Sequence, residues 1–342
     1  MCDVTRRALL RGTAIAGGVG LAKLTAQPAL DESRVGQVDT LATDVYFHQG
    51  NMAGTPCNNG WIVFKDYVLV IDANYPSGAS EIIPKIRAIT DKPIRFAFDT
   101  HHHGDHSYGN QIFVDNGATA IAHTGVIEEM KRAETGYYGG KPGAWEASTR
   151  ADVKASHLSP PTVTFPKELY FDDGVHRVEL LHLGVAHTHG DAVAWLPKER
   201  ILFTGDVCVN GPFNYVGDGN VEKWIATLAE ARKLGARIVC PGHGARGVES
   251  DLADQQFFFQ QLRESVGAEV TARHTPKEIN ENLEQLRASL LAQPRCARFV
   301  GKNSLKPQVE KVYEEMTGQK LQSGAAKAAK LQHAHAHRMQ LA

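Results

Sequence analysis

The sequence predicts an α+β fold: two β-sheets packed face to face with helices on their outer sides, which makes a four-layer αββα sandwich. Three observations support this prediction. In each half of the chain, short apolar runs come first and helical patterns follow. The runs are continuously apolar, as strands buried on both faces are. With 342 residues, of which 42% are hydrophobic and 22% charged, the chain can bury a large core.

The first half begins with β-structure and passes into helices and strands. Apolar runs at 61–64 and 68–71 flank the polar pair Lys65-Asp66, which predicts a hairpin. The predicted elements are, in order, β-structure over 36–75, a helix through the isoleucines at 82, 83, 86 and 89, strands over 94–98 and 118–122, a helix over 125–133, and a long loop or partly helical insertion over 134–160.

The second half repeats this pattern and then becomes helical. An amphipathic helix is predicted around Trp224 to Ala231, with Asn220 as its cap. Thr275 begins another helix through a capping box, and apolar residues continue that helix to Leu290. The strands predicted in this half cover 162–171, 175–183, 191–196, 200–205 and 237–240.

The chain divides into four segments: an export signal over 1–30, a main folded domain over 36–250, a helical C-terminal extension over 251–318, and a disordered tail over 319–342. The first segment resembles a twin-arginine signal, because Arg6-Arg7 precede a short Gly- and Ala-rich apolar run and small residues follow. We therefore expect a periplasmic or secreted protein, with the export machinery as a partner of this segment.

Composition excludes some classes of partner. The formal net charge is −1, so the basic footprint of a nucleic-acid-binding protein is absent. No apolar stretch approaches the roughly 20 residues that span a bilayer. Four cysteines follow the export segment, at 57, 208, 240 and 296. Their spacing shows no disulfide framework and favours buried free thiols, although an exported chain can oxidise them in three pairings.

The densest group of metal-binding side chains is His101-His102-His103-Gly104-Asp105-His106, directly after the apolar run at 94–98. Neutral imidazole is the commonest metal ligand, and the carboxylate adds a hard oxygen. Alternate side chains at a strand end point the same way, so His101 and His103 can meet at one point. Asp105 and His106 then face a second point nearby. This layout suits two metal ions.

Further candidate ligands follow other apolar runs: Asp72 in Ile71-Asp72-Ala73, His187 in Ala186-His187-Thr188, Asp206 in Thr204-Gly205-Asp206, and His243 in Pro241-Gly242-His243. With the His-x-His-x-Asp-His run, these parts occur in the order typical of one family, and the chain resembles the metallo-β-lactamase fold superfamily over roughly residues 38–247. The resemblance implies the αββα fold and makes 36–250 a metallo-β-lactamase-like catalytic domain.

The resemblance also implies a ligand set: His101, His103 and His187 for a first metal, Asp105, His106 and His243 for a second, and Asp206 as a bridge between them. Three neutral imidazoles and a hydroxide would complete a tetrahedral zinc site. Two ions about 3.5–4 Å apart can hold one hydroxide between them. The expected cofactor is two Zn²⁺ ions, with iron and manganese left open because the same ligands suit them.

Residues beside these ligands are given supporting roles or none. Asp72 matches a family position near the metals and is expected to orient a ligand histidine, as carboxylates around metal sites do. Thr188 and Asp191 are expected to act in the same way. His102 and His189 match no ligand position, and we expect them beside the site or facing solvent.

Position 206 carries aspartate, whereas some β-lactamases of this fold have cysteine there and a lysine three residues later. Here residue 209 is valine, and Cys208 lies close enough in sequence to be an alternative ligand. The run Thr204-Gly205-Asp206 is typical of the ester- and thioester-hydrolysing branches, which favours Asp206. The missing lysine weakens the case for efficient β-lactam hydrolysis.

The implied function is metal-dependent hydrolysis of a small-molecule substrate: an ester, thioester, lactone or lactam. Hydroxide would attack the carbonyl carbon, and Asp105 would orient the hydroxide and shuttle its proton. A class B β-lactamase proper and an iron-dependent oxidoreductase on the same fold are the alternatives. Substrate contacts are expected from the loops 51–58, 134–160 and 209–219. Candidates for the pocket wall are Tyr75, Trp145, Phe213 and Tyr215.

Overall fold

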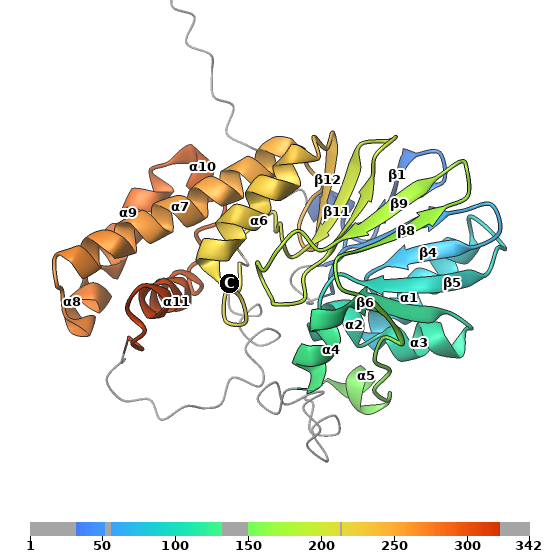
Figure 1. Cartoon of the computed structure of the whole chain (residues 1–342), viewed down its shortest axis with the longest axis horizontal. Coiled ribbons are helices and arrows are strands. Elements are labelled where there is room, and N and C mark those ends of the chain that lie inside the picture. The colour runs from blue at the N-terminus through green and yellow to red at the C-terminus, as the bar shows by residue number, and fades with distance from the viewer. Residues whose placement is uncertain (1–31, 52–55, 132–149, 213, 322–342) are drawn as a thin grey trace, which may run out of the picture.

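The computed structural model describes residues 32–51, 56–131, 150–212 and 214–321. The predicted export signal, Trp145, Phe213 and most of the predicted tail lie outside these residues. The described chain forms two β-sheets with helices on their outer sides, so the predicted α+β sandwich is confirmed (Figure 1).

The first sheet has seven strands in sequence order. They are β1 Val38–Ala42, β2 Val45–His48, β3 Asn59–Val63, β4 Val68–Ile71, β5 Ile94–Asp99, β6 Thr119–His123 and β7 Val163–Phe165. Strands β1 to β4 pair antiparallel, and β4 to β7 pair parallel. The predicted hairpin is β3–β4, in which Trp61 lies opposite Val70.

The second sheet has five strands in the order β12-β11-β10-β9-β8. Their bounds are β8 Glu168–Asp172, β9 Arg177–Leu181, β10 Val193–Leu196, β11 Ile201–Gly205 and β12 Ile238–Pro241. Only the β11–β12 pair is parallel, and the other neighbours pair antiparallel.

The core between the sheets comes from strict alternation along buried strands. Ile62, Leu69 and Ile71 point inward and pack with Phe203 and Leu180 of the second sheet. Because each such side chain is removed from water, its burial contributes about 1.5–3 kcal/mol. The neighbouring residues Trp61, Val68 and Val70 point outward beneath the helices that cover the first sheet.

Six short helices belong to the first half: the 3₁₀ helix η1 Glu32–Arg34, α1 Pro76–Arg87, α2 Gly104–Ser107, α3 Asn110–Asp115, α4 Thr124–Lys131 and α5 Ala151–Lys154. Ile82 and Ile86 of α1 and Phe113 of α3 cover the outer face of the first sheet. The helix that the isoleucine spacing predicts through residue 89 ends two residues earlier, at Arg87.

The outer face of the second sheet is covered by α6 Val221–Lys233 and α7 Glu249–Thr271. Asn220 caps α6 by accepting a hydrogen bond from the backbone N–H of Lys223 at 2.8 Å, as the sequence predicts. The remaining helices of the extension are α8 Pro276–Glu281, α9 Leu283–Leu291, α10 Pro294–Ala297 and α11 Leu305–Thr317, and they pack beside α6 and α7 (Figure 1).

Two elements that the sequence predicts as continuous are each interrupted in the structure. The single strand expected over 162–171 is two strands in different sheets, β7 and β8, because Pro166 lacks the N–H that a ladder needs and the chain crosses over there. The helix that begins after Thr275 ends at Glu281, and α9 starts at Leu283. Only the predicted capping box of Thr275 with Glu278 is confirmed.

Two predictions from composition can be compared with the described residues. The four cysteines described, at 57, 208, 240 and 296, are free and buried, as expected. None of the helices in the described ranges is both long and apolar enough to cross a bilayer.

Candidate metal centre

Strand ends of the two sheets bring the candidate ligands together. Asp72 follows β4 and His101 closely follows β5, and these parallel strands end at the same edge of the first sheet. Asp206 follows β11, and His243 follows its parallel neighbour β12 in the second sheet. His187 lies in the connection from β9 to β10. All five side chains are buried.

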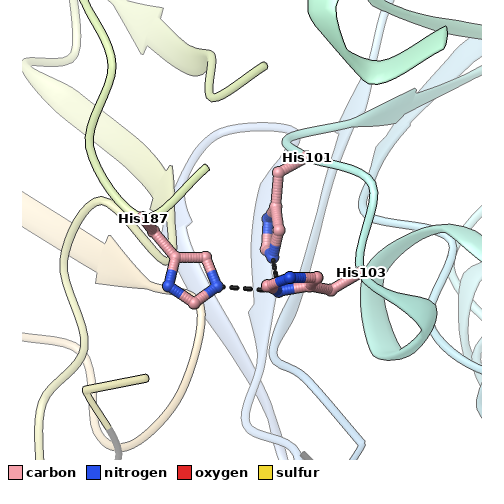
Figure 2. A group of neighbouring side chains, drawn as sticks. All are labelled: His101, His103 and His187. Carbon is pink, nitrogen blue, oxygen red and sulfur yellow. Dashed lines mark hydrogen bonds between the residues drawn. The ribbon is translucent and has the colours of Figure 1, made fainter. Parts of the chain in front are cut away.

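One group contains three imidazoles, those of His101, His103 and His187 (Figure 2). Nδ1 of His103 lies 3.2 Å from Nε2 of His101 and 2.8 Å from Nε2 of His187. Three nitrogens from two distant segments therefore face a common point. This is the trio that the family resemblance implies for a first metal.

A second group contains Asp105, His106 and His243. Nε2 of His243 lies 3.0 Å from Oδ2 of Asp105 and 3.4 Å from Nε2 of His106. Nε2 of His106 lies 3.6 Å from the same carboxylate oxygen. The structure thus places the trio predicted for a second metal around one point as well.

Asp206 lies between the two groups. Its Oδ1 is 3.4 Å from Nε2 of His106 and 3.6 Å from Nε2 of His243, whereas its Oδ2 is 3.4 Å from Nε2 of His187. One oxygen therefore faces the second group and the other faces the first. This is the arrangement that a bridging carboxylate requires.

The surroundings of Asp206 fit a cation better than a hydrogen-bond network. Both carboxylate oxygens are buried, and neither accepts a hydrogen bond within the described residues. A buried charge left in this way costs several kcal/mol. Two ligands bound about 2.1 Å from a tetrahedral ion lie about 3.4 Å apart, which matches the spacing around Asp206. The donor set, with imidazole nitrogens and carboxylate oxygens, fits divalent zinc.

Two glycines leave room for side chains of the centre, Gly242 for Asp206 and Gly205 for Thr100. A Cβ on Gly242 would collide with Oδ1 of Asp206, and a Cβ on Gly205 would collide with the side chain of Thr100. Gly205 also has φ +50°, a conformation that favours glycine. Steric crowding therefore explains why glycine precedes both Asp206 and His243.

Asp72 contacts two parts of the centre at once. Its Oδ2 lies 2.9 Å from Nδ1 of His106, and its Oδ1 accepts a hydrogen bond from the backbone N–H of Thr100 at 2.9 Å. Oγ1 of Thr100 is in turn 3.1 Å from Nδ1 of His101. Asp72 thus touches an imidazole of the second group directly and lies one residue away from an imidazole of the first.

The loop before α6 supplies two contacts that sequence reasoning missed. Oδ2 of Asp218 lies 2.9 Å from Nε2 of His103, and the backbone carbonyl of Tyr215 lies 2.8 Å from Nδ1 of His187. No sequence signal points to Asp218, and a backbone acceptor has none by nature. Tyr215 is a candidate for the pocket wall because of its ring, which lies 5.7 Å from the ring of His103.

Thr188 and Asp191 bind each other rather than a ligand imidazole. Asp191 accepts hydrogen bonds from the backbone N–H of Thr188 at 2.8 Å and from its hydroxyl at 2.7 Å. Burial raises the pKa of Asp191 to about 7, although both bonds from Thr188 act in the opposite direction. The pair closes the turn that follows His187. Within the described residues, the two side chains therefore act on the segment of His187 only through this turn, and their supporting role stays a prediction.

The remaining residues that the sequence places near the ligands lie in different surroundings. His102 is buried with its ring 4.6 Å from that of His103, whereas His189 is exposed beside Glu128. Cys208 packs in the core with Trp224 and belongs to none of the possible metal-binding groups of the described chain. The structure therefore places Asp206, and not Cys208, among the imidazoles.

Burial and nearby charges shift the pKa values of the imidazoles in opposite directions. Burial lowers the pKa of His101 well below its usual range, and neighbouring imidazoles lower it further. Burial acts in the same direction on His103, His106 and His243, but the attraction of nearby acidic groups outweighs it. The net pKa of each of these three imidazoles is therefore raised. A divalent cation must displace those protons, so metal uptake releases protons and weakens as the pH falls.

Comparison with known proteins agrees with this geometry. The family model for the metallo-beta-lactamase superfamily matches residues 52–243, more than half of the chain. "Metallo-beta-lactamase type 2" proteins of Pseudomonas aeruginosa and Bacteroides fragilis are 30% and 36% identical over 74 and 75 residues, which are 21% and 20% of this chain. Each match spans only 30% of the relative's length.

Longer similarities are weaker in sequence. Metallo-beta-lactamase IND-1 of Chryseobacterium indologenes is 22% identical over 192 residues, 54% of this chain and 71% of the relative. The solved structure of a metallo-beta-lactamase from Pontibacter korlensis has the same fold, with a TM-score of 0.54 and 20% identity over 66% of this chain and 98% of that one. The chain belongs to the metallo-beta-lactamase superfamily, a family of hydrolytic enzymes.

Proposed function

We propose that this chain is a dinuclear-zinc hydrolase in which hydroxide attacks the carbonyl carbon of a small ester, thioester, lactone or lactam and the acyl C–O, C–S or C–N bond is cleaved. The observation that carries the proposal is the position of Asp206, whose two buried oxygens face two separate groups of imidazoles. A bridging carboxylate between two ligand trios is the geometry of a two-ion site.

The interatomic distances sort the candidate ligands into two groups, and each group would hold one ion. His101, His103 and His187 would hold one ion, and Asp105, His106 and His243 the other, with Asp206 shared. When bound, two such ions supply an activated water at neutral pH and polarise the carbonyl that it attacks.

Asp105 is proposed to move the proton of that reaction. Its carboxylate is fully buried, and its Oδ2 faces Nε2 of both His106 and His243. A carboxylate fixed in this way can orient the attacking water and take its proton at Oδ before passing it to the leaving group. Burial of the surrounding side chains excludes bulk water, which strengthens these interactions.

Class B β-lactamase activity is the second candidate, and the names of the curated relatives favour it. Val209 stands where a substrate-binding lysine would be expected and is fully buried in this structure. A lactam carboxylate would need another cation, so we rank lactams below simple esters and thioesters.

The test is metal analysis of the purified protein together with a panel of ester, thioester, lactone and β-lactam substrates, each with and without chelator. We expect close to two zinc ions per chain and chelator-sensitive turnover of at least one ester or thioester. Nitrocefin turnover that exceeds all the others would support the lactamase alternative. A coloured, iron-containing protein that is inactive on the whole panel would refute hydrolysis in favour of an oxidoreductase.

Export is a separate part of the proposal. The pair Arg6-Arg7 before a short apolar run supports delivery of a folded, metal-loaded protein to the periplasm by the twin-arginine route. Replacement of both arginines by lysine should retain the protein in the cytoplasm. Fractionation with mass spectrometry locates the protein. Unchanged export of this variant would contradict the twin-arginine route and leave the proposed hydrolysis untouched.

A further inference from the structure

Helix α11 of the C-terminal extension lies along the loop that precedes α6. Two hydrogen bonds join α11 to this loop: Gln308 Nε2 donates to the carbonyl of Asn214 at 2.8 Å, and Lys311 Nζ donates to the carbonyl of Gly217 at 3.3 Å. A third joins α11 to the start of α6, where the backbone N–H of Val221 donates to Oε1 of Glu315 at 2.8 Å. Each bond connects residues that are 94 positions apart. The helix and the loop therefore run side by side in a fixed register.

The three residues of α11 share one face of the helix. Positions 308, 311 and 315 follow the i, i+3, i+7 spacing that places side chains in one row. Gln308 is 1% exposed, and Glu315 is also held by Arg263 at 3.1 Å. A buried amide that donates to a loop carbonyl is costly to remove, because the carbonyl would lose its partner away from water.

Helix α7 holds the same loop from a second side. Gln255, fully buried, accepts a hydrogen bond from the backbone N–H of Val209 at 2.9 Å and donates one to Oδ1 of Asn214 at 2.9 Å. Asn214 is therefore fixed through its side chain by α7 and through its backbone carbonyl by Gln308 of α11.

The loop fixed in this way carries the two contacts to the first group of imidazoles. The residue after Asn214 is Tyr215, whose carbonyl meets Nδ1 of His187, and the residue after Gly217 is Asp218, whose carboxylate meets Nε2 of His103. Two of the three imidazoles of that group are thus oriented by this loop. In the second group, His106 is oriented by Asp72 at the end of β4, on the opposite sheet.

We propose that α11 is a positioning element of the first metal group, in which Gln308 and Lys311 act through the backbone of residues 214–218 on His187 and His103. The inference rests on the metal centre of the proposed function and adds a role for the extension. Outer contacts of metal-binding histidines contribute 10–100-fold to affinity. Residues one step further out are expected to contribute up to about tenfold, and only to the first group.

The test measures the exchange of imidazole protons by NMR in the full chain, both zinc-loaded and metal-free. Three protons report on the two groups: Nδ1–H of His187, Nε2–H of His103, and Nδ1–H of His106 as the internal reference. In Gln308→Met and in Lys311→Met we expect the first two protons to exchange up to about tenfold faster while the third is unchanged. Lys311→Arg keeps a cationic donor at this position, so its exchange rates should equal those of the parent.

Two control variants carry similar changes without touching the loop. Gln256→Met removes a buried amide of α7 that donates to the carbonyl of Ile225 and accepts from Arg232. Glu310→Gln alters an ion pair with Lys306 that lies within α11. Both should leave all three exchange rates at parent values. Zinc competition should show weaker binding of one ion in Gln308→Met and of neither ion in the controls.

Unchanged exchange at His187 and His103 would overturn the inference, and so would equal acceleration of all three protons, which indicates general loosening. Because Lys311 bonds at the surface, Lys311→Met keeps the test decisive if Gln308→Met does not fold. The exchange rates are measurable even in a chain that hydrolyses no substrate in the panel. Failure of the proposed reaction and failure of this inference are therefore distinguishable.

Discussion

The carboxylate of Asp72 lies 2.9 Å from Nδ1 of His106, and both side chains are buried. Because that nitrogen is held by the carboxylate, Nε2 of the same ring is aimed at Asp206 and His243. A carboxylate in this position fixes both the tautomer and the orientation of a metal-binding imidazole.

Asp72→Asn should therefore weaken binding of the second ion. The amide keeps the size of the side chain but removes the charge, and we expect a 10–100-fold loss in affinity for one of two zinc ions. Zinc competition with a chromophoric chelator measures the two affinities separately. Asp218→Asn is the matched variant for His103, and it should weaken the first ion instead. Equal effects of both variants on both ions would contradict the assignment.

Asp206→Asn should impair both ions, because its two oxygens face different groups. We expect zinc content to fall below two per chain and turnover of the best substrate to fall at least about 100-fold, the order of loss seen when charge stabilisation is removed from an active site. The measurement is zinc content with kcat/KM on that substrate.

Cys208→Ser is the matched control for the alternative ligand. Cys208 packs in the same core cluster as Trp224 and belongs to none of the candidate metal-binding groups of the described residues, so its position does not suit a ligand. Parent zinc content is expected in this variant. Loss of zinc in Cys208→Ser with retention in Asp206→Asn would reverse the assignment.

The sequence predicts most of the ligand segments because they follow closely on apolar runs that become strands, whereas His187 lies within the connection from β9 to β10. The parallel pairs β4–β5 and β11–β12 then deliver Asp72, His101, Asp206 and His243 to neighbouring strand ends. Local pattern and topology agree at these positions, so little beyond strand order is needed to bring the side chains together.

The outer contacts could not be predicted in the same way. Asp218 and the carbonyl of Tyr215 reach their imidazoles only because α7 and α11 place their loop, and those contacts span many intervening residues. Thr188 and Asp191 show the reverse problem. Their proximity to His187 in sequence predicts a supporting role, but it does not predict that the two side chains bind each other in a short Asp–Thr turn.

A buried histidine away from the centre predicts how stability depends on pH. His48 is 4% exposed at the end of β2, and burial lowers its pKa to about 4, with Glu81 at 3.7 Å acting in the opposite direction and Lys85 in the same direction. Unfolding restores a pKa near 6.5, so the unfolded chain binds the extra proton between these values. The free energy of unfolding should therefore fall as the pH drops from about 6.5 to about 4, by up to about 3 kcal/mol from this residue.

His48→Gln removes the titrating group and should flatten this slope, measured by urea unfolding of the metal-free protein at intervals between pH 6.5 and 4. The metal-free protein is used so that release of zinc does not contribute. Because every other titrating group is common to parent and variant, the difference between their slopes isolates His48. A slope in His48→Gln as steep as that of the parent would show that this histidine is already protonated or accessible to water in the folded chain.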